Sequence, residues 1–179
     1  ATMLLCTLNV ATADDNLIKN GTFSDKKLVP WKLFATEDLI KPTFKTAGGV
    51  ITITSAAVSP KPSNELLTQK LEGIKPETKY KLSYDAKSTD TKAELLINLS
   101  RSKEYSKGHY GFFKKSTLTN EWKTYTCKFT TKKIDEGNTP QLKFHMGLLK
   151  GEIQFRNVKL VEAKQKVIEE VIEEIEAIE

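Results

Sequence analysis

The sequence predicts an all-β chain built as an antiparallel β-sandwich. Six segments alternate between apolar and polar residues with a period of two, and clusters of Gly, Pro, Asn, Asp and Lys separate them. No segment with helical periodicity interrupts the series, and consecutive short strands without helices are typical of sandwiches. The expected strands cover residues 49–56, 78–88, 92–101, 122–131, 141–148 and 152–161.

The length and the alternation together predict one core. The chain has 179 residues, of which 39% are apolar, and this suffices for one domain with tails. One face of each strand is assigned to the core: Ile51, Ile53, Tyr80, Leu82, Tyr84, Ala86, Leu95, Ile97, Leu99, Leu142, Phe144 and Met146. The opposite face is polar and is expected to meet solvent or a ligand: Thr52, Thr54, Ser83, Asp85, Asn98, Ser100, Lys128, Lys143 and His145.

Residues 1–15 form an N-terminal tail that indicates export. An apolar stretch from Met3 to Val10 precedes Ala11-Thr12-Ala13, the small-x-small pattern after which signal peptidases cleave. A secreted or cell-surface protein is therefore expected. Two alternatives stay open: the tail is the remnant of a signal peptide, or residues 3–10 are a mature β-prone segment that adds as a strand to its own sheet or to a neighbour's.

Residues 163–179 change pattern and form an acidic amphipathic helix or linker. Ile168, Val171, Ile175 and Ile178 follow one another at helical steps. The apolar stripe over residues 167–178 is expected to dock on the sandwich, on a partner chain or on a further domain. Residues 162–179 contain seven Glu and two Lys, so an acidic tail follows a basic body in a chain of net charge +5.

The basic body and the two cysteines leave several interpretations open. A positive surface attracts nucleic acid, acidic polysaccharide or cell wall, although scattered lysines also simply keep a protein soluble. Cys6 and Cys127 can pair in an exported chain. Because Cys127 alternates in phase with Tyr125 and Phe129, a buried, inert thiol is the favoured interpretation.

The segment Asn16-Leu17-Ile18-Lys19-Asn20-Gly21-Thr22-Phe23 predicts how the sandwich begins. The Asn20-Gly21 pair is expected to supply a turn with positive φ, Leu17 and Ile18 to start the first strand, and Phe23 to return to the core. Trp31 then opens the next strand. This arrangement resembles the N-terminal signature "NL(I/V)xNGxFE…W" of the carbohydrate-binding modules of families 4, 9, 16 and 22.

The resemblance extends through residues 16–162 in the expected order. ITITS followed by Gln69-Lys70-Leu71, the strand from Tyr80 to Lys87, the segment from Trp122 to Phe129, and LKFHMG with IQFRNVKLVE are each similar to a family element. The resemblance implies a galactose-binding-like jelly roll that binds polysaccharide without catalysis, alone or as the ancillary module of a larger glycoside-active enzyme. The two tryptophans of the chain match family positions that are mainly structural, so Trp122 is expected in the core and Trp31 as a marginal ligand contact.

Two departures from the family pattern concern its structural calcium. The resemblance implies acidic ligands at the positions of Ser24 and Arg156. A guanidinium repels Ca²⁺, which requires several hard oxygen ligands, so this metal site is expected to be lost, with Arg156 bridging the same carbonyl groups. Asp14 and Asp15 leave a weaker case for Ca²⁺ nearby, and no cofactor is expected.

A glycan site is predicted from aromatic and planar polar residues. Sugars offer an apolar face to aromatic rings and hydroxyls to polar groups. Residues 101–113, taken as a loop or loose hairpin, contribute Tyr105, His109, Tyr110, Phe112 and Phe113 as the expected ligand wall. The alternative is a hairpin whose aromatic rings only cap the sandwich. Strand phase and the resemblance add Gln69, Asn98, Arg101 and His145 on a concave sheet.

Other chemistry has little support. Glycoside hydrolysis requires two carboxylates across a cleft, and Asp85 and Glu94 have no such spacing. The two histidines lack zinc-ligand companions, and nucleic-acid recognition signatures are absent. The prediction is a non-catalytic module for polysaccharide, of acidic or cell-wall type. The alternative is a self-assembling surface or filament subunit that uses residues 3–10 and 167–178 for contacts between copies.

Overall fold

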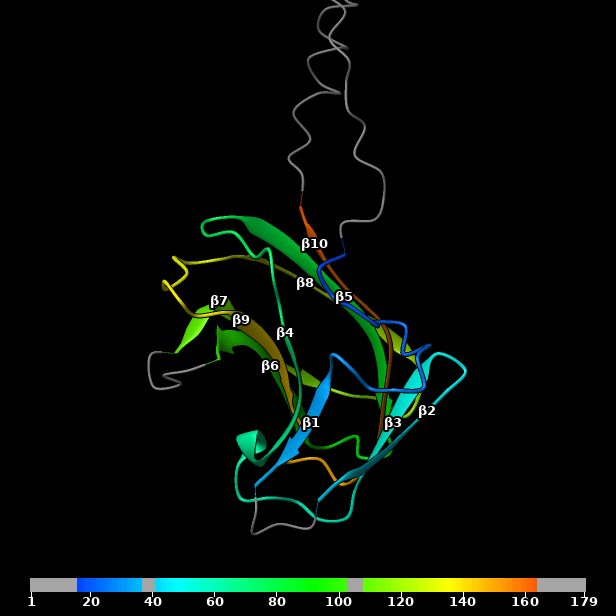
Figure 1. Cartoon of the computed structure of the whole chain (residues 1–179). Coiled ribbons are helices and arrows are strands. Elements are labelled where there is room, and N and C mark those ends of the chain that lie inside the picture. Colours follow the sequence, from blue (N-terminus) through cyan, green and yellow to red (C-terminus); the bar gives the residue numbers. More distant parts are fainter. Residues whose placement is uncertain (1–15, 37–40, 103–107, 164–179) are drawn as a thin grey trace, which may run out of the picture.

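The protein is a sandwich of two five-stranded antiparallel sheets (Figure 1). The computed structural model describes residues 16–36, 41–102 and 108–163, and within them the only helical element is the 3-10 turn η1 (Pro62–Asn64). The first sheet has the order β1 (Lys32–Ala35), β4 (Glu65–Lys70), β9 (Pro140–His145), β6 (Glu94–Arg101) and β7 (His109–Thr117). The second has the order β2 (Thr43–Ala47), β3 (Val50–Ser55), β10 (Gly151–Glu162), β5 (Lys79–Ser88) and β8 (Lys123–Thr130).

All six predicted strands are present, as β3, β5, β6, β8, β9 and β10. The strand expected after Trp31 is β1, whereas β2 and β4 were not predicted as strands. Of the two forms predicted for residues 101–113, a loop or a loose hairpin, the structure has the hairpin, because His109 begins β7, which pairs antiparallel with β6. The tails, residues 1–15 and 164–179, lie outside the described residues, and the predictions for them stay predictions.

The core lies between the two sheets where the alternation predicted it. All twelve predicted core residues are at most 1% exposed. Tyr84 meets Phe144 edge to face with ring centroids 5.4 Å apart, and Phe144 lies 5.0 Å from Phe155. Rings from both sheets therefore interlock at the centre, and this geometry adds to the burial of apolar area.

The segment before β1 packs along the sandwich without forming the predicted strand at Leu17 and Ile18. The Oδ1 atom of Asn16 accepts hydrogen bonds from Ile18 N–H (3.0 Å) and Leu160 N–H (2.9 Å). This side chain therefore takes backbone donors that a strand ladder would use. Trp31 is 2% exposed and donates through Nε1 to Asn20 O, so it belongs to the core and makes no groove contact.

Trp122 corrects a second expectation, because it lies outside the buried core. Its ring is contacted by Arg156, whose Cζ is 4.3 Å from the ring centroid, and by Lys87, whose Nζ is 5.1 Å away. The half-buried indole therefore takes part in cation–π contacts. Cys127 packs against the core, as its phase with Phe129 predicted, but it is half-buried and not buried as expected. Cys6 lies outside the described residues.

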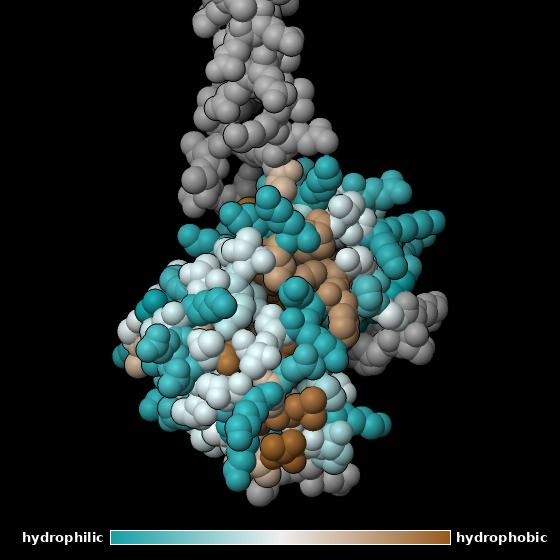
Figure 2. Space-filling model, turned by 180° about the vertical axis from the view of Figure 1, so that it is seen from behind, coloured by the Kyte–Doolittle hydropathy of each residue, from teal (hydrophilic) through white to brown (hydrophobic). Residues whose placement is uncertain are grey.

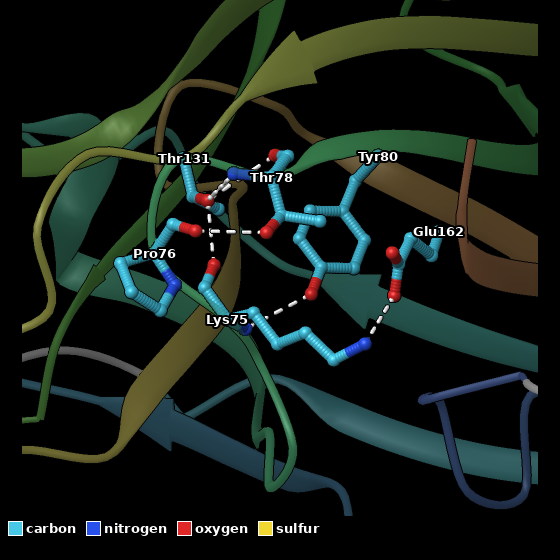
Figure 3. Close-up of polar contacts among 6 residues, drawn as sticks. All are labelled: Lys75, Pro76, Thr78, Tyr80, Thr131 and Glu162. Atoms are coloured by element: carbon cyan, nitrogen blue, oxygen red, sulfur yellow. Dashed lines mark hydrogen bonds and ion pairs between the residues drawn. The ribbon is translucent and has the colours of Figure 1, made fainter. Parts of the chain in front are cut away.

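A polar network fixes the end of the sandwich at which both ends of the described chain emerge (Figures 1 and 3). The Thr131 hydroxyl accepts from Thr78 N–H (3.0 Å) and donates to Lys75 O (2.6 Å). The Tyr80 hydroxyl accepts from Lys75 N–H at 2.9 Å, and the Lys75 ammonium lies 2.8 Å from the Glu162 carboxylate. The turn before β5 is thereby tied to the ends of β8 and β10.

The surface is mostly hydrophilic. In the view of Figure 2, hydrophilic residues cover much of the face, and apolar residues reach the surface in a band and a smaller cluster. The large hydrophobic side chains that stay exposed in the described part of the chain are Val29, Phe34, Phe44, Val58 and Phe113. Among the residues described, no helix has the length and apolar character needed to cross a membrane.

Candidate functional site

A groove of about 570 Å³ lies on the outer face of the first sheet. Cross-strand rows of outward-facing side chains form its floor. The middle row runs across all five strands as Lys32, Thr68, Lys143, Asn98 and Phe113. The groove is therefore a product of register: each of these residues directly opposes the next.

Two flanking rows complete the floor. On one side, His145 of β9 opposes Leu66 of β4, which in turn opposes Phe34 of β1. On the other side, Gln141 of β9 opposes Ser100 of β6, which opposes His109 of β7. The floor is polar at its centre and has apolar side chains toward the rims.

Two phenylalanines stand at opposite edges of the groove. Phe34 lies on edge strand β1 and is 51% exposed, and Phe113 lies on edge strand β7 and is 46% exposed. The His109 ring packs beside Phe113 with a centroid distance of 5.8 Å. Exposed rings on both rims of a polar floor offer flat apolar contacts to a bound molecule.

Four polar atoms in the groove are buried and have no hydrogen-bond partner within the described part of the chain. They are Asn98 Oδ1, Ser100 Oγ, His109 Nδ1 and His145 Nε2. A buried polar atom without a partner costs about 1–3 kcal/mol. Such atoms require a partner from outside the chain, which can be a water molecule, an ion or a ligand.

Burial also changes the protonation of the groove's ionisable groups. Desolvation, together with the positive charge of Lys143, lowers the pKa of His145 to about 4. Desolvation and the charges of Lys132 and Arg101 lower the pKa of His109, and desolvation lowers the pKa of Lys143 to about 8. At neutral pH both imidazoles are uncharged and each can donate from one nitrogen and accept at the other.

The structure places Asn98 and His145 in this groove, together with His109 and Phe113 of the predicted ligand wall. Gln69 is not among its lining residues, because its side chain points inward and is 1% exposed. Its Oε1 accepts from Lys19 N–H at 2.8 Å and its Nε2 donates to Lys19 O at 2.9 Å. The expectation that Gln69 lies on the open face is corrected: it holds the N-terminal segment against β4.

Tyr110 and Phe112 also face inward, contrary to the expectation that they line a ligand wall. They are 1% and 3% exposed, and Phe112 stacks on Phe129 with ring centroids 4.4 Å apart. Because residues 109–117 form a strand, alternation turns Phe112 inward and Phe113 outward. Tyr105, also predicted in this wall, lies outside the described residues.

Arg101 lies beside the groove and is held by a polar cluster. Its guanidinium forms an ion pair with Asp135, donates to Gly108 O at 2.9 Å and covers the Tyr110 ring at 4.5 Å from the centroid. These contacts brace the chain on both sides of residues 103–107. The structure thus gives Arg101 a supporting position at the edge of the groove.

Sequence reasoning missed Phe34 as a groove residue and did not single out Ser100 and Lys143. Both belong to the predicted polar face, and the pairing of β6 with β9 is the information needed to bring them together. Phe113 and His109, which the predicted ligand wall included, do line the groove, because alternation along β7 turns both outward. For Phe34, the short strand after Trp31 had been expected, but its outward face had not been assigned.

Comparison with known proteins decides the family. A family model described as a carbohydrate binding domain, CBM_4_9, matches residues 15–153. The chain belongs to this family of carbohydrate binding domains. No match was found among curated proteins.

Solved structures show the same fold. A CBM4 structure is similar with a TM-score of 0.70 and 22% identity, covering 82% of this chain and 99% of the other. The second N-terminal cellulose-binding domain of the Cellulomonas fimi β-1,4-glucanase C is similar with a TM-score of 0.67 and 21% identity, covering 87% and 99%. The enzymatically active fragment of tailspike protein 4 from bacteriophage CBA120 has a TM-score of 0.63 and 15% identity over 83% of this carbohydrate binding domain and 22% of the tailspike chain.

Proposed function

We propose that this carbohydrate binding domain binds a polysaccharide chain along the groove on the outer face of the first sheet. The observation that carries the proposal is the set of four buried, unpartnered polar atoms between two exposed phenylalanine rings. Family membership supports a glycan as the ligand class.

The chemistry of the groove suits a sugar chain. The carbonyl oxygen of Asn98 accepts hydrogen bonds, and the Ser100 hydroxyl and the neutral imidazole of His145 can each accept or donate. Sugar hydroxyls both donate and accept, so they can pair with all of these groups. The flat apolar faces of pyranose rings would cover Phe34 and Phe113.

The test replaces Asn98 by alanine and measures affinity for a panel of soluble polysaccharides by affinity electrophoresis and calorimetry. Because Asn98 Oδ1 has no partner in the described structure, the change should leave folding intact. We expect Asn98→Ala to weaken binding to the retained polysaccharide by about tenfold. The matched control is Gln154→Ala, on the second sheet, where Gln154 Nε2 donates to Thr52 Oγ1.

Equal affinity for Asn98→Ala and the unchanged protein would contradict binding in this groove. Retention of no polysaccharide by the unchanged protein would contradict the function itself.

We also propose a non-catalytic role in a secreted or cell-surface protein. The two acids considered for hydrolysis do not face each other across the groove: Asp85 of β5 pairs with Arg156 at 3.1 Å, and Glu94 of β6 pairs with Lys115 at 3.3 Å. Neither is among the residues that line the groove. The pattern at Ala11-Thr12-Ala13 supports export.

We propose further that the fold needs no calcium. Asp85, a carboxylate next to Arg156, is already occupied: its Oδ1 accepts from Thr124 Oγ1 at 2.7 Å, and its Oδ2 accepts from Arg156 and from Asn157 Nδ2. Within residues 16–36, 41–102 and 108–163, no group of three His, Cys, Asp or Glu side chains could hold a metal ion. Asp14 and Asp15 lie outside these ranges.

Chelation therefore provides a direct prediction. Excess EDTA is expected to shift the melting temperature by less than about 1 °C, and added CaCl₂ should not raise it, because only a ligand of the native state stabilises it. The measurement is differential scanning fluorimetry of the chain from Ala1 to Glu179. A clear fall in melting temperature with EDTA, restored by Ca²⁺, would show a calcium site.

Self-assembly is the alternative function, and one observation favours keeping it. Leu17 N–H donates to Leu160 O at 2.9 Å, so the chain enters and leaves the sandwich side by side (Figure 1). The described chain therefore begins and ends at the same end of the domain. Light scattering of the whole chain beside a version that starts at Asp14 separates the functions, since oligomers formed only by the whole chain would favour assembly.

A further inference from the structure

The described residues that line the groove carry charge of one sign. Two lysines, Lys32 and Lys143, are the charged side chains among the described residues that line it, and no Asp or Glu is among those residues. Both belong to the middle row, on either side of Thr68. An uncharged sugar chain needs hydrogen-bonding groups and apolar surfaces but no cation, so the lysines require a separate explanation.

Lys143 is buried at the centre of the groove floor. It is 6% exposed and sits on the central strand β9, between Thr68 of β4 and Asn98 of β6. Its ammonium group donates to Arg101 O at 3.3 Å. Burying an ammonium is costly, and a leucine or threonine would complete the sheet without that cost. A cation kept at the centre of a ligand groove points to a role toward the ligand.

We propose that the groove selects glycans that contain uronic acid residues, with the sugar carboxylate placed beside Lys143 and Lys32. The inference rests on the proposed glycan function and names the substrate class of the same site. The neutral groups of the floor, Asn98, Ser100 and His145, bind the hydroxyls. The rings of Phe34 and Phe113 cover the apolar sugar faces.

Surrounding groups favour an anion at this point. Arg101 lies at the edge of the groove and adds positive charge to that of the lysines, although its ion pair with Asp135 offsets part of it. His109 and His145 stay neutral at pH 7 because burial lowers both pKa values. In a half-buried groove the attraction between an ammonium and a carboxylate is several times stronger than in water.

The test compares oligosaccharides that differ only in their carboxylates. One pair is a β-1,4-linked glucuronate hexamer and cellohexaose, which differ at C6 alone. A second pair is a β-1,4-linked mannuronate hexamer and mannohexaose, and a third is glucuronoxylan before and after carboxyl reduction. Calorimetry is expected to show at least one acidic member bound about tenfold or more tightly than its neutral partner.

Three single variants locate the charge that produces this preference. Lys143→Gln and Lys32→Gln should each reduce the ratio of acidic to neutral affinity by about fivefold or more. Lys32 is exposed, so its replacement should not affect folding. Lys45→Gln is the matched control, because Lys45 is exposed on β2 of the second sheet and the change in net charge is the same.

A pH profile distinguishes Lys143 from the general positive charge. Among the described residues, the charged and titratable groups near it are Lys32, His109, His145 and Arg101, and both imidazoles are neutral from about pH 7 to pH 9 because burial lowers their pKa values. Because burial lowers the pKa of Lys143 to about 8, its ammonium is mostly present at about pH 7 and mostly lost at about pH 9. Acidic oligosaccharides should bind about tenfold more weakly at the higher pH, and Lys143→Gln should remove most of this dependence.

The possible results separate the inference from the proposed function. Equal affinity for the acidic and neutral members of every pair would overturn the inference alone and leave glycan binding in place. A loss of preference in Lys45→Gln equal to that in Lys143→Gln would also overturn it, because the attraction would then be diffuse. Failure to bind any of the six probes would overturn the inference together with the proposed function.

Discussion

Alanine in place of Phe113 is expected to weaken glycan binding by about tenfold, and Phe34→Ala by a similar factor. Each ring is about half exposed, and full burial of a phenylalanine contributes about 1.5–3 kcal/mol. Covering the exposed half with a sugar ring therefore contributes about 1–1.5 kcal/mol, which corresponds to about tenfold in Kd. Because the rings stand on opposite edges of the groove, their effects should add in the double variant.

Because both rings are half exposed, shortening either of them removes little packing. A change in binding can therefore be measured without a large loss of stability. Phe44→Ala is the control: Phe44 is 46% exposed, as Phe113 is, but lies on β2 of the second sheet. Melting temperatures and polysaccharide affinities of all four variants are compared. If Phe44→Ala weakens binding as much as Phe113→Ala does, the groove is not the site. If neither rim variant has an effect, the sugar does not lie between the rings.

Alternation predicted the core because its physical cause is local. A side chain in a strand points to the face opposite its neighbours, so Leu82 and Tyr84 had to face the same way once the strand was recognised. A sandwich buries one face of each sheet, and the more apolar face must be the buried one. Both conditions depend on a few consecutive residues, and the printed sequence contains them.

The groove depended on information that no single segment contains. Lys143, Asn98 and Thr68 come from separate strands, and the register of β4, β9 and β6 alone brings them into one row. The buried position of Gln69 also depends on a residue that is distant in the sequence. A glutamine on a strand is expected to be exposed, but the backbone of Lys19 supplies both of its partners, and that contact spans 50 residues of sequence.

Tyr110 and Phe112 show how an error in secondary structure becomes an error in the site. Interpreting a Gly-containing segment as a loop or loose hairpin makes each aromatic ring available to a ligand, whereas a regular strand turns alternate rings inward. Gly111 is instead a strand residue with φ of 89°, and a Cβ there would lie 2.3 Å from Thr130 O. It lets β7 approach the end of β8 closely, so the glycine that indicated a loop belongs to the strand.

Gly21→Ala is expected to destabilise the protein more than any of the other substitutions. Its effect would show what Gly21 contributes to the Asn20-Gly21 turn. Asn20 has the positive φ that the pair predicted, at 48°, whereas Gly21 is not in that region. Its role is close approach: a Cβ at Gly21 would lie 2.0 Å from Val158 O. The same two residues are joined by a 2.8 Å hydrogen bond from Val158 N–H to Gly21 O, so the added methyl group cannot be avoided without breaking that contact.

The expected cost of Gly21→Ala is about 3 kcal/mol, at the upper end of overpacking effects, because the obstacle is backbone. For a chain of this size the melting temperature should fall by about 10 °C. Gly137→Ala is the comparison: Gly137 has φ of +71° and nothing within 4 Å of an added Cβ, so it tests backbone strain alone, at about 1 kcal/mol. If both variants lose the same stability, the close approach to β10 contributes nothing. If Gly21→Ala loses far more stability, then the packing of the N-terminal segment, which carries Phe23 and Trp31 into the core, depends on the close approach of Gly21 to β10.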